Sequence, residues 1–167
     1  KAAIERLLDR GLLRFEPHPV ISAQTGAIAG YYLQARSDEP TLPELGMIVE
    51  LAKTNGLTSE LDRLYWSTAL DTLRILARRH NLGKETTFFL EPMSGCQPKM
   101  REWQALSRKY PTILSRTVIL LAENPQEDRR WLNTLGCMFA VPGGCDETAE
   151  SGAAFVVLRE EQTCGIE

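Results

Sequence analysis

Two glutamates that follow apolar runs are the residues best placed for chemistry. Glu91 follows the run Thr86–Leu90, and Glu123 follows the run Thr117–Ala122. Carboxylates at the ends of strands can bind a divalent cation weakly, but a protein site for a hard cation needs more than two such ligands. No third ligand stands at a suitable spacing from this pair. The residues therefore predict no metal site and no cofactor.

The cysteines and histidines do not form a zinc-binding pattern either. None of the four cysteines belongs to a C-x-x-C pair, and neither His18 nor His80 stands at zinc-ligand spacing from them. We therefore expect free thiols in a reducing cytoplasm. A disulfide between Cys137 and Cys145 is the open alternative. We expect His18, between two prolines, to lie in a loop and His80 to lie at a helix C-terminus.

An aromatic pair and an arginine are the remaining candidates for ligand binding. Tyr31 and Tyr32 could stack on a base, but adjacent strand residues face opposite sides of a sheet, so at most one could contact a ligand. We expect one in the core and one at the rim. Arg36 could bind a phosphate through its guanidinium fork. The alternative is a surface ion pair with Asp38 or Glu39.

Composition limits the partners that the chain can have. Its 167 residues suffice for one domain, 1–167, and are 43% hydrophobic and 25% charged, as in a globular protein. The 19 basic and 22 acidic residues give a net charge of -3, which predicts neither a nucleic-acid partner nor a membrane partner. No apolar run could span a bilayer, and the first residues lack the apolar core of a signal peptide. We expect a cytoplasmic domain, cut from a longer protein.

The elements that position these residues begin with a hairpin. A helical stripe over Ala2–Asp9 ends at Gly11. Strand patterns over Leu12–Phe15 and Ala27–Ala35 flank the turn Gln24–Gly26, so the pattern predicts an antiparallel pair.

Helices and strands then alternate. Helices are predicted over Glu44–Asn55, from a cap at Thr58 or Ser59 to about His80, over Met100–Tyr110 and from Pro125 to Leu135. Strands are predicted over Thr86–Leu90, Thr117–Ala122, Cys137–Val141 and Ala153–Leu158. Such alternation predicts an α/β fold with right-handed crossovers and a mostly parallel sheet. The sheet could be open or part of a β/α barrel.

This order of elements and several short motifs resemble EAL domains, the cyclic di-GMP phosphodiesterases. The family begins with a strand of the type Y-Q-P-I-V, a turn T-G-x-I-x-G and the motif E-A-L-x-R, and continues with A-x-x-x-G-L, L-D-R and L-G-x-x-x-A. The matching segments here are Phe15-Glu-Pro17, Thr25-Gly-Ala-Ile-Ala-Gly30, Tyr32-Leu-Gln-Ala-Arg36, Leu51-Ala-Lys-Thr-Asn-Gly-Leu57, Leu61-Asp-Arg63 and Leu135-Gly-Cys-Met-Phe-Ala140. The resemblance implies a partial TIM-like barrel opened by a hairpin, because a whole barrel needs roughly 250 residues.

The departures from the family concern its metal ligands. The resemblance places the glutamate of E-A-L at Tyr32, the next asparagine at about Phe89 and the next glutamate at about Leu120. The aspartate pair falls at about Pro142-Gly143. None of these side chains except the phenol could offer an oxygen to a hard cation. The resemblance therefore implies a degenerate, truncated domain that is not an enzyme.

The same comparison leaves two functions open. Arg36 matches the family's phosphate-contacting arginine, whereas Glu16 stands where the family has a ligand-contacting glutamine. Our first hypothesis is a catalytically inactive regulatory module in bacterial signalling that binds a protein partner or self-associates as a dimer, covering the open barrel edge. The alternative is a non-hydrolysing cyclic di-GMP receptor that uses Arg36, Tyr32, Glu16, Glu91 and Glu123.

Overall fold

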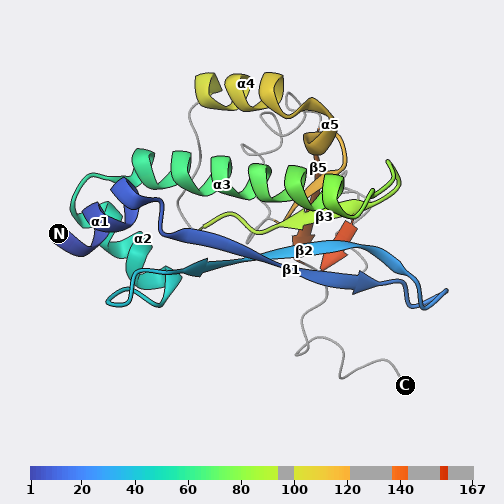
Figure 1. Cartoon of the computed structure of the whole chain (residues 1–167), viewed down its shortest axis with the longest axis horizontal. Coiled ribbons are helices and arrows are strands. Elements are labelled where there is room, and N and C mark those ends of the chain that lie inside the picture. The colour runs from blue at the N-terminus through green and yellow to red at the C-terminus, as the bar shows by residue number, and fades with distance from the viewer. Residues whose placement is uncertain (94–99, 121–136, 143–154, 158–167) are drawn as a thin grey trace.

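A six-stranded mixed sheet forms the framework of the protein (Figure 1). The structure is a computed structural model that describes residues 1–93, 100–120, 137–142 and 155–157. Its strands are β1 (Leu13–Ile21), β2 (Ile28–Ser37), β3 (Thr87–Leu90), β4 (Thr117–Leu120), β5 (Met138–Pro142) and β6 (Phe155–Val157). The β1–β2 pair is antiparallel, and every later pair is parallel. The predicted hairpin followed by a mostly parallel sheet is confirmed.

The spatial order of the strands is the order of the chain, β1 to β6. Right-handed crossovers that always advance in one direction place their helices on the same face of a sheet. Accordingly, α3 (Thr58–Arg79) lies over the hairpin, and α4 (Met100–Lys109) lies on the far side of α3 (Figure 1). A doubly wound sheet would need a reversal of strand order, and the described strands contain none. The closure of this sheet into part of a barrel stays a prediction.

The helix ends follow local chain chemistry. Helix α1 (Ala2–Arg10) ends at Gly11, whose φ of 62° is left-handed, and Gly56, with a φ of 69°, follows α2 (Leu45–Thr54). Glycine takes this conformation without a Cβ clash. The predicted cap of α3 is wrong, because Leu57 occupies that position without a side-chain hydrogen bond. The short helix α5 (Pro111–Leu114) was not predicted, and the helix predicted from Pro125 to Leu135 lies outside the described residues.

Strand β1 is longer than its apolar pattern predicts. It continues through Pro17 and Pro19 to Ile21, so His18 lies in a strand and the loop prediction is wrong. Proline is tolerated in the outer strand of a sheet, where its missing N–H removes no ladder bond. Here β1 is an outer strand of the described sheet. Its two prolines therefore leave the pairing with β2 intact.

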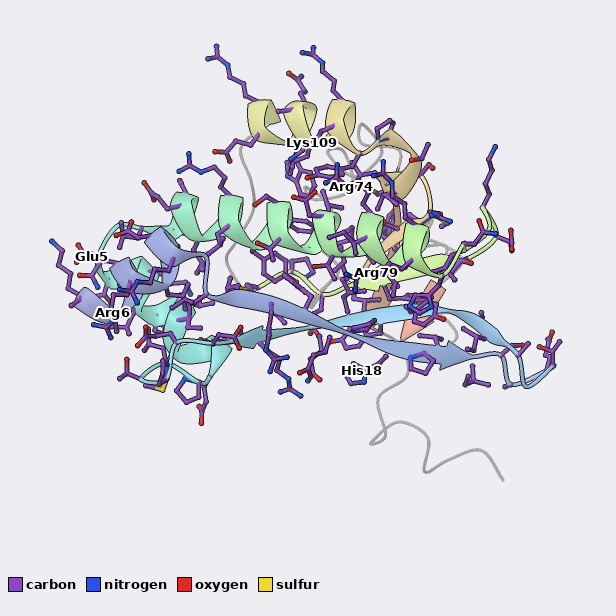
Figure 2. The ribbon with its side chains drawn as sticks, in the orientation of Figure 1. Glu5, Arg6, His18, Arg74, Arg79 and Lys109 are labelled. Carbon is purple, nitrogen blue, oxygen red and sulfur yellow. The ribbon has the colours of Figure 1, made fainter. Side chains whose placement is uncertain are left out.

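The two faces of the sheet differ in polarity because side chains alternate along each strand. On the helix-covered face, Leu33 of β2 and Phe88 of β3 are buried in the main core. On the second face lie Glu16, Gln34 and Arg36, which are partly or fully exposed. Figure 2 shows His18 on this second face, away from α3. The second face is therefore where polar chemistry can occur.

Aromatic rings join the sheet to both layers of helices. Phe15 of β1 meets Tyr65 of α3 at a centroid distance of 5.0 Å, and Tyr65 meets Trp66 at 5.4 Å. Trp66 in turn meets Trp103 of α4 at 4.5 Å. Such edge-to-face contacts add to the apolar burial that fixes the helices. Among the described residues, no helix is long and apolar enough to cross a membrane.

One glycine determines how closely β2 and β3 can approach. Gly30 pairs with Thr87, and a Cβ at position 30 would lie 2.1 Å from the Thr87 carbonyl oxygen. Any larger residue would push the two strands apart. This register brings Tyr32 beside Phe89.

Candidate functional site

A row of side chains crosses the second face of the sheet. Tyr32 is paired with Phe89, Phe89 with Val118, and Val118 with Met138. Because parallel neighbours in register share a face, these four side chains lie on the same side of the sheet as Gln34 and Arg36. Tyr32 is the polar member of the row. The other three members contribute no oxygen ligand.

Tyr32 makes its polar contact with the residue that follows β3. Its hydroxyl donates a hydrogen bond of 3.1 Å to Oε2 of Glu91. Burial, and then the charge of Glu91, raise the pKa of Tyr32 to about 12, whereas Arg36 lowers it. The phenol is therefore neutral at ordinary pH and acts as a donor. The backbone carbonyl of Glu91 accepts a hydrogen bond from the buried Tyr65, which fixes the end of β3.

A cleft of about 520 Å³ opens beside this pair, which we call the carboxyl-end cleft. Its floor comes from the ends of β2 and β3, and its wall comes from α2 and from Tyr65 of α3. The lining residues used below are Tyr32, Gln34, Glu50, Lys53 and Glu91. Lys53 is paired with Glu50 at 3.1 Å, so the acids of the lining outnumber its single cation. The cleft suits a neutral or cationic group better than a bare phosphate.

An exposed ion network lies beside the cleft on the β1–β2 hairpin. Glu16 accepts a 3.1 Å hydrogen bond from Nε of Arg36 and a second one from Arg14. Arg36 also donates to the side-chain oxygen of Gln34 at 2.8 Å, and Arg14 pairs with Asp38 at 2.7 Å. The bonds from Arg14 first, and then from Arg36, lower the pKa of Glu16. Every charge of this network is thus compensated within the chain.

The predicted ion pair of Arg36 with Asp38 or Glu39 is wrong. Arg36 pairs with Glu16, not with Asp38 or Glu39, because Glu16 is paired in the hairpin register with Gln34 and therefore lies diagonally across from Arg36 on the same face. Glu39 is instead 3% exposed and accepts two hydrogen bonds from the guanidinium of Arg6, at 2.8 and 3.3 Å. The bond from Arg6, then that from the Thr41 hydroxyl, lower the pKa of Glu39 to about 2.

The structure brings together only some of the predicted site residues. Tyr32 and Glu91 meet in the carboxyl-end cleft, while Arg36 and Glu16 pair beside it. Glu123 lies outside the described residues. Tyr31 is partly buried against the core and Tyr32 lies on the other face, so the two tyrosines face opposite sides of the sheet as predicted, although neither is fully in the core.

Sequence reasoning missed three residues of the cleft. Gln34 could have been found, since it shares the strand face of Tyr32 and Arg36 and links the cleft to the ion network. A buried tyrosine needs a hydrogen-bond partner for its hydroxyl. The helical pattern around Tyr65 does not show that this partner is the carbonyl of Glu91. Lys53 gave no signal either, because a lysine on an exposed helix face is ordinary.

Metal and thiol chemistry can be assessed for the described part of the chain. There, no group of three or more His, Cys, Asp or Glu side chains could hold a metal ion. Cys137 is a free, buried thiol, and burial raises its pKa to about 12. A thiol that stays protonated is a poor nucleophile and metal ligand. The alternative disulfide with Cys145 stays a prediction, because Cys145 lies outside the described residues.

Comparison with known proteins identifies the fold. No protein-family model and no curated protein matches the sequence. Among solved structures, the chain is similar to the FimX EAL domain of Xanthomonas citri in complex with cyclic di-GMP, with a TM-score of 0.66 and 16% identity over 94% of this chain and 67% of that one. It is similar to the MucR phosphodiesterase in its cyclic di-GMP complex, with a TM-score of 0.66 and 13% identity over 93% and 70%.

A third similar structure is the GGDEF–EAL portion of Vibrio cholerae LapD bound to cyclic di-GMP. Its TM-score is 0.69 and its identity 11%, over 98% of this chain and 45% of that one. At such identities the similarity shows the fold alone. The chain has the fold of EAL domains along nearly its whole length, and it spans about two thirds of the FimX domain. The predicted resemblance is confirmed at the level of the fold.

Proposed function

We propose that this chain is an EAL-like domain, part of an incomplete β/α barrel, that has lost phosphodiesterase activity. It serves as a regulatory, protein-interacting module in bacterial signalling. One observation carries this proposal: the residue that the resemblance places at the glutamate of E-A-L is Tyr32, and its phenol is hydrogen-bonded to Glu91. The nearest carboxylate is thus engaged by a neutral donor in place of a cation.

The neighbouring positions support the loss of metal chemistry. Phosphodiester hydrolysis of this kind uses divalent metals that activate water, and the protein must supply their oxygen ligands. Phe89 stands beside Tyr32 in the register, and Leu120 stands beside Ala140. The side chains of Phe89, Leu120 and Ala140 carry no oxygen that could hold a hard cation. Glu50, on the wall of the cleft, is paired with Lys53.

A hydrolysis assay tests this half of the proposal. Cyclic di-GMP incubated with the protein and Mg²⁺ or Mn²⁺ should remain intact under conditions in which the MucR phosphodiesterase degrades it. The variant Tyr32→Glu should remain inactive too, because it restores one ligand and leaves Phe89 and Leu120 unchanged. Metal-dependent hydrolysis that is lost in Glu91→Gln would show that the site is active.

The tip of the β1–β2 hairpin supports the protein-interaction half. Ile21 and Ile28 face each other in the register there, and they are 53% and 56% exposed. Exposed apolar pairs on a protruding element favour contact with another protein (Figure 1). We expect light scattering to give a dimer mass, or a mass that includes a partner, and Ile21→Ser with Ile28→Ser to weaken the association. A stable monomer that binds no partner would contradict the proposal.

A non-hydrolysing cyclic di-GMP receptor is the second candidate function. The position of the carboxyl-end cleft favours it, because this cleft lies at the edge of the sheet where β/α folds bind their ligands, with Arg36 close by through Gln34. The two glutamates of the lining count against it. Calorimetry with cyclic di-GMP tests it. Binding that is lost in Arg36→Gln and kept in Arg14→Gln would support the receptor, since both variants remove one charge from the same network. No heat at high micromolar ligand would exclude it.

A further inference from the structure

A second pocket lies at the opposite edge of the parallel sheet, and we call it the basic pocket. It is formed where α3 ends, where α4 passes into α5, and where the chain enters β3 and β4. Its volume is about 390 Å³. The lining residues that matter here are Arg74, Arg78, Asn81, Lys109, Tyr110 and Arg116.

The lining of the basic pocket carries an excess of positive charge. Its lining contains four cationic side chains and no carboxylate, in a chain whose net charge is -3. Asp71 stands just outside and is shared by two of them: its carboxylate lies 2.6 Å from Arg74 and 3.9 Å from Lys109. Figure 2 shows Arg74 and Lys109 between α3 and the layer of α4. One acid for four cations leaves a surplus of positive charge around an empty volume.

Two of the cations lie against aromatic rings. The guanidinium of Arg116 lies 4.7 Å from the ring centroid of Phe88 and donates to the carbonyls of Leu82 and Gly83. Lys109 lies 4.8 Å from the ring centroid of Tyr110. Arg116, which is also hydrogen-bonded, therefore loses little freedom when an anion binds beside it. In the described part of the structure, Nε of Arg116 is buried and has no hydrogen-bond partner.

Tyr110 provides an independent sign of a missing ligand. Its side chain is 1% exposed and lines the basic pocket, yet its hydroxyl makes no hydrogen bond of ordinary geometry with any described residue. Burial is the main reason why its pKa is raised; a contact with Lys109 lowers it and a contact with Asp71 raises it, so both charged groups lie near the hydroxyl without completing a well-formed hydrogen bond. A buried hydroxyl without a well-formed hydrogen bond destabilises a protein. An acceptor oxygen in the pocket would satisfy it.

Helix dipoles explain only part of this arrangement. Arg78 and Lys109 lie in the last turns of α3 and α4, where a cation is favoured in any helix. Arg74 lies farther from the end of α3, and Arg116 lies in the chain between α5 and β4. Their convergence on one pocket with the Tyr110 hydroxyl is not a dipole effect. Guanidinium groups that converge are the usual receptors for phosphate oxygens.

We infer that the basic pocket binds a phosphate group of a small soluble molecule, at a site separate from the carboxyl-end cleft. Arg74, Arg78 and Lys109 supply the charge, and the Tyr110 hydroxyl donates a hydrogen bond to a phosphate oxygen. Because these residues come from α3 and from the α4–α5 segment, a bound phosphate would also tie those two helical layers together.

Titration of the intact chain with pyrophosphate tests the inference by calorimetry. We expect saturable binding with one site per chain that weakens as salt is added. Arg78→Gln should weaken binding by roughly tenfold, as expected for one charged contact. Arg79→Gln is the matched control, since it removes the same charge from the next residue of α3, which does not line the pocket. Equal losses in both variants, or no saturable binding by the unmodified chain, would overturn the inference.

Tyr110→Phe separates a binding role from a structural one. If the hydroxyl awaits a ligand, its removal should leave the melting temperature of the free protein unchanged or raised and should weaken pyrophosphate binding several-fold, by roughly the worth of one hydrogen bond. If the hydroxyl serves the fold, its removal should lower the melting temperature and leave binding unchanged. The second result would contradict the inference.

Discussion

The two edges of the parallel sheet both carry arginine and lysine side chains, but these cations are paired with carboxylates to different extents. At the carboxyl ends of the strands, Arg36 is neutralised by Glu16, and Lys53 by Glu50. At the amino ends, Arg78 and Arg116 line a pocket without any carboxylate. In β/α folds the first edge normally carries the chemistry and the second serves stability. Here the cations at the first edge are paired with carboxylates. The cations at the second edge outnumber the carboxylates near them.

The difference shows that residue type alone does not identify a binding site. An arginine is available to a ligand only to the extent that the chain leaves it without an acid of its own. Arg36 was a candidate because of its type and its place in a motif. The register of the hairpin then placed Glu16 beside it, whereas the lining of the basic pocket contains no carboxylate and Asp71 stands just outside it.

The largest effect should come from Gly30→Ala, which disturbs the sheet that separates the two edges. A Cβ there would lie 2.1 Å from a backbone oxygen of β3, and neither strand can move without losing its register. We expect a loss of ~3 kcal/mol or more in the free energy of unfolding. Chemical denaturation measures it. Binding at both edges should be lost with the fold.

Gly46→Ala is the control for that substitution. Gly46 lies in α2, and a Cβ there would have nothing within 4 Å. Alanine is also the better helix former. We expect unchanged or slightly higher stability, so equal destabilisation by the two variants would show that the close approach of β2 and β3 is not the cause.

Glu39→Gln should have the next largest effect on stability. Glu39 lies in the loop that follows β2, at the carboxyl-end edge of the sheet. Because the folded carboxyl has a pKa of about 2, below its ordinary value of 4.5, its ion pair with Arg6 stabilises the fold above that ordinary value. This stabilisation is lost as the pH falls toward 2. The variant should therefore melt at a lower temperature than the unmodified chain at neutral pH, and the two should converge in acid.

Asp38→Asn provides the comparison for this acid-dependent effect. Asp38 pairs with Arg14, but both side chains are about half exposed, and such pairs contribute little. Thermal melts across the acid range should show hardly any difference from the unmodified chain. A variant at position 39 that behaved in the same way would mean that burial of Glu39 does not strengthen its ion pair.

Much of the fold could be predicted from the sequence because it rests on local patterns. The hairpin turn ending at Gly26, the stripe of α3 and the apolar run of β4 each occur within a few neighbouring residues. The extension of β1 past Pro17 was missed, because proline disfavours a central strand and the sequence does not show which strand is the outer one. The cap of α3 was missed because several capping residues stood close together.

The candidate site was less predictable because its contacts join distant parts of the chain. Tyr32 meets Glu91 across 59 positions, and Arg6 meets Glu39 across 33. A strand face can be predicted from alternation, but the partner of each side chain depends on the register between strands. The basic pocket was missed for the same reason, since Arg74 and Arg116 become neighbours only through packing of α3 against the α4–α5 segment.

A smaller effect is expected at Tyr32, the polar member of the row in the carboxyl-end cleft. The pKa of its phenol is raised to about 12, so its hydrogen bond with Glu91 stabilises the fold below pH 10, the ordinary pKa, and is lost as the pH rises through about 12. Tyr32→Phe should cost about 1 kcal/mol or less at neutral pH. An ultraviolet titration of the variant should lack one phenol signal near pH 12. If the signal that disappears in the variant has an ordinary phenol pKa, the hydrogen bond between Tyr32 and Glu91 is contradicted.

The smallest effect, and the most direct test of the contrast between the edges, should come from Glu16→Gln. Glu16 is partly exposed, so we expect no measurable change in melting temperature. If compensation is what keeps the carboxyl-end edge from binding anions, removal of this acid should leave Arg36 without a carboxylate partner and create weak, salt-sensitive pyrophosphate binding. The substitution belongs in an Arg78→Gln background, where the basic pocket is impaired. Unchanged affinity in that background would mean that the shape of the edge, and not its paired charges, prevents an anion from binding there.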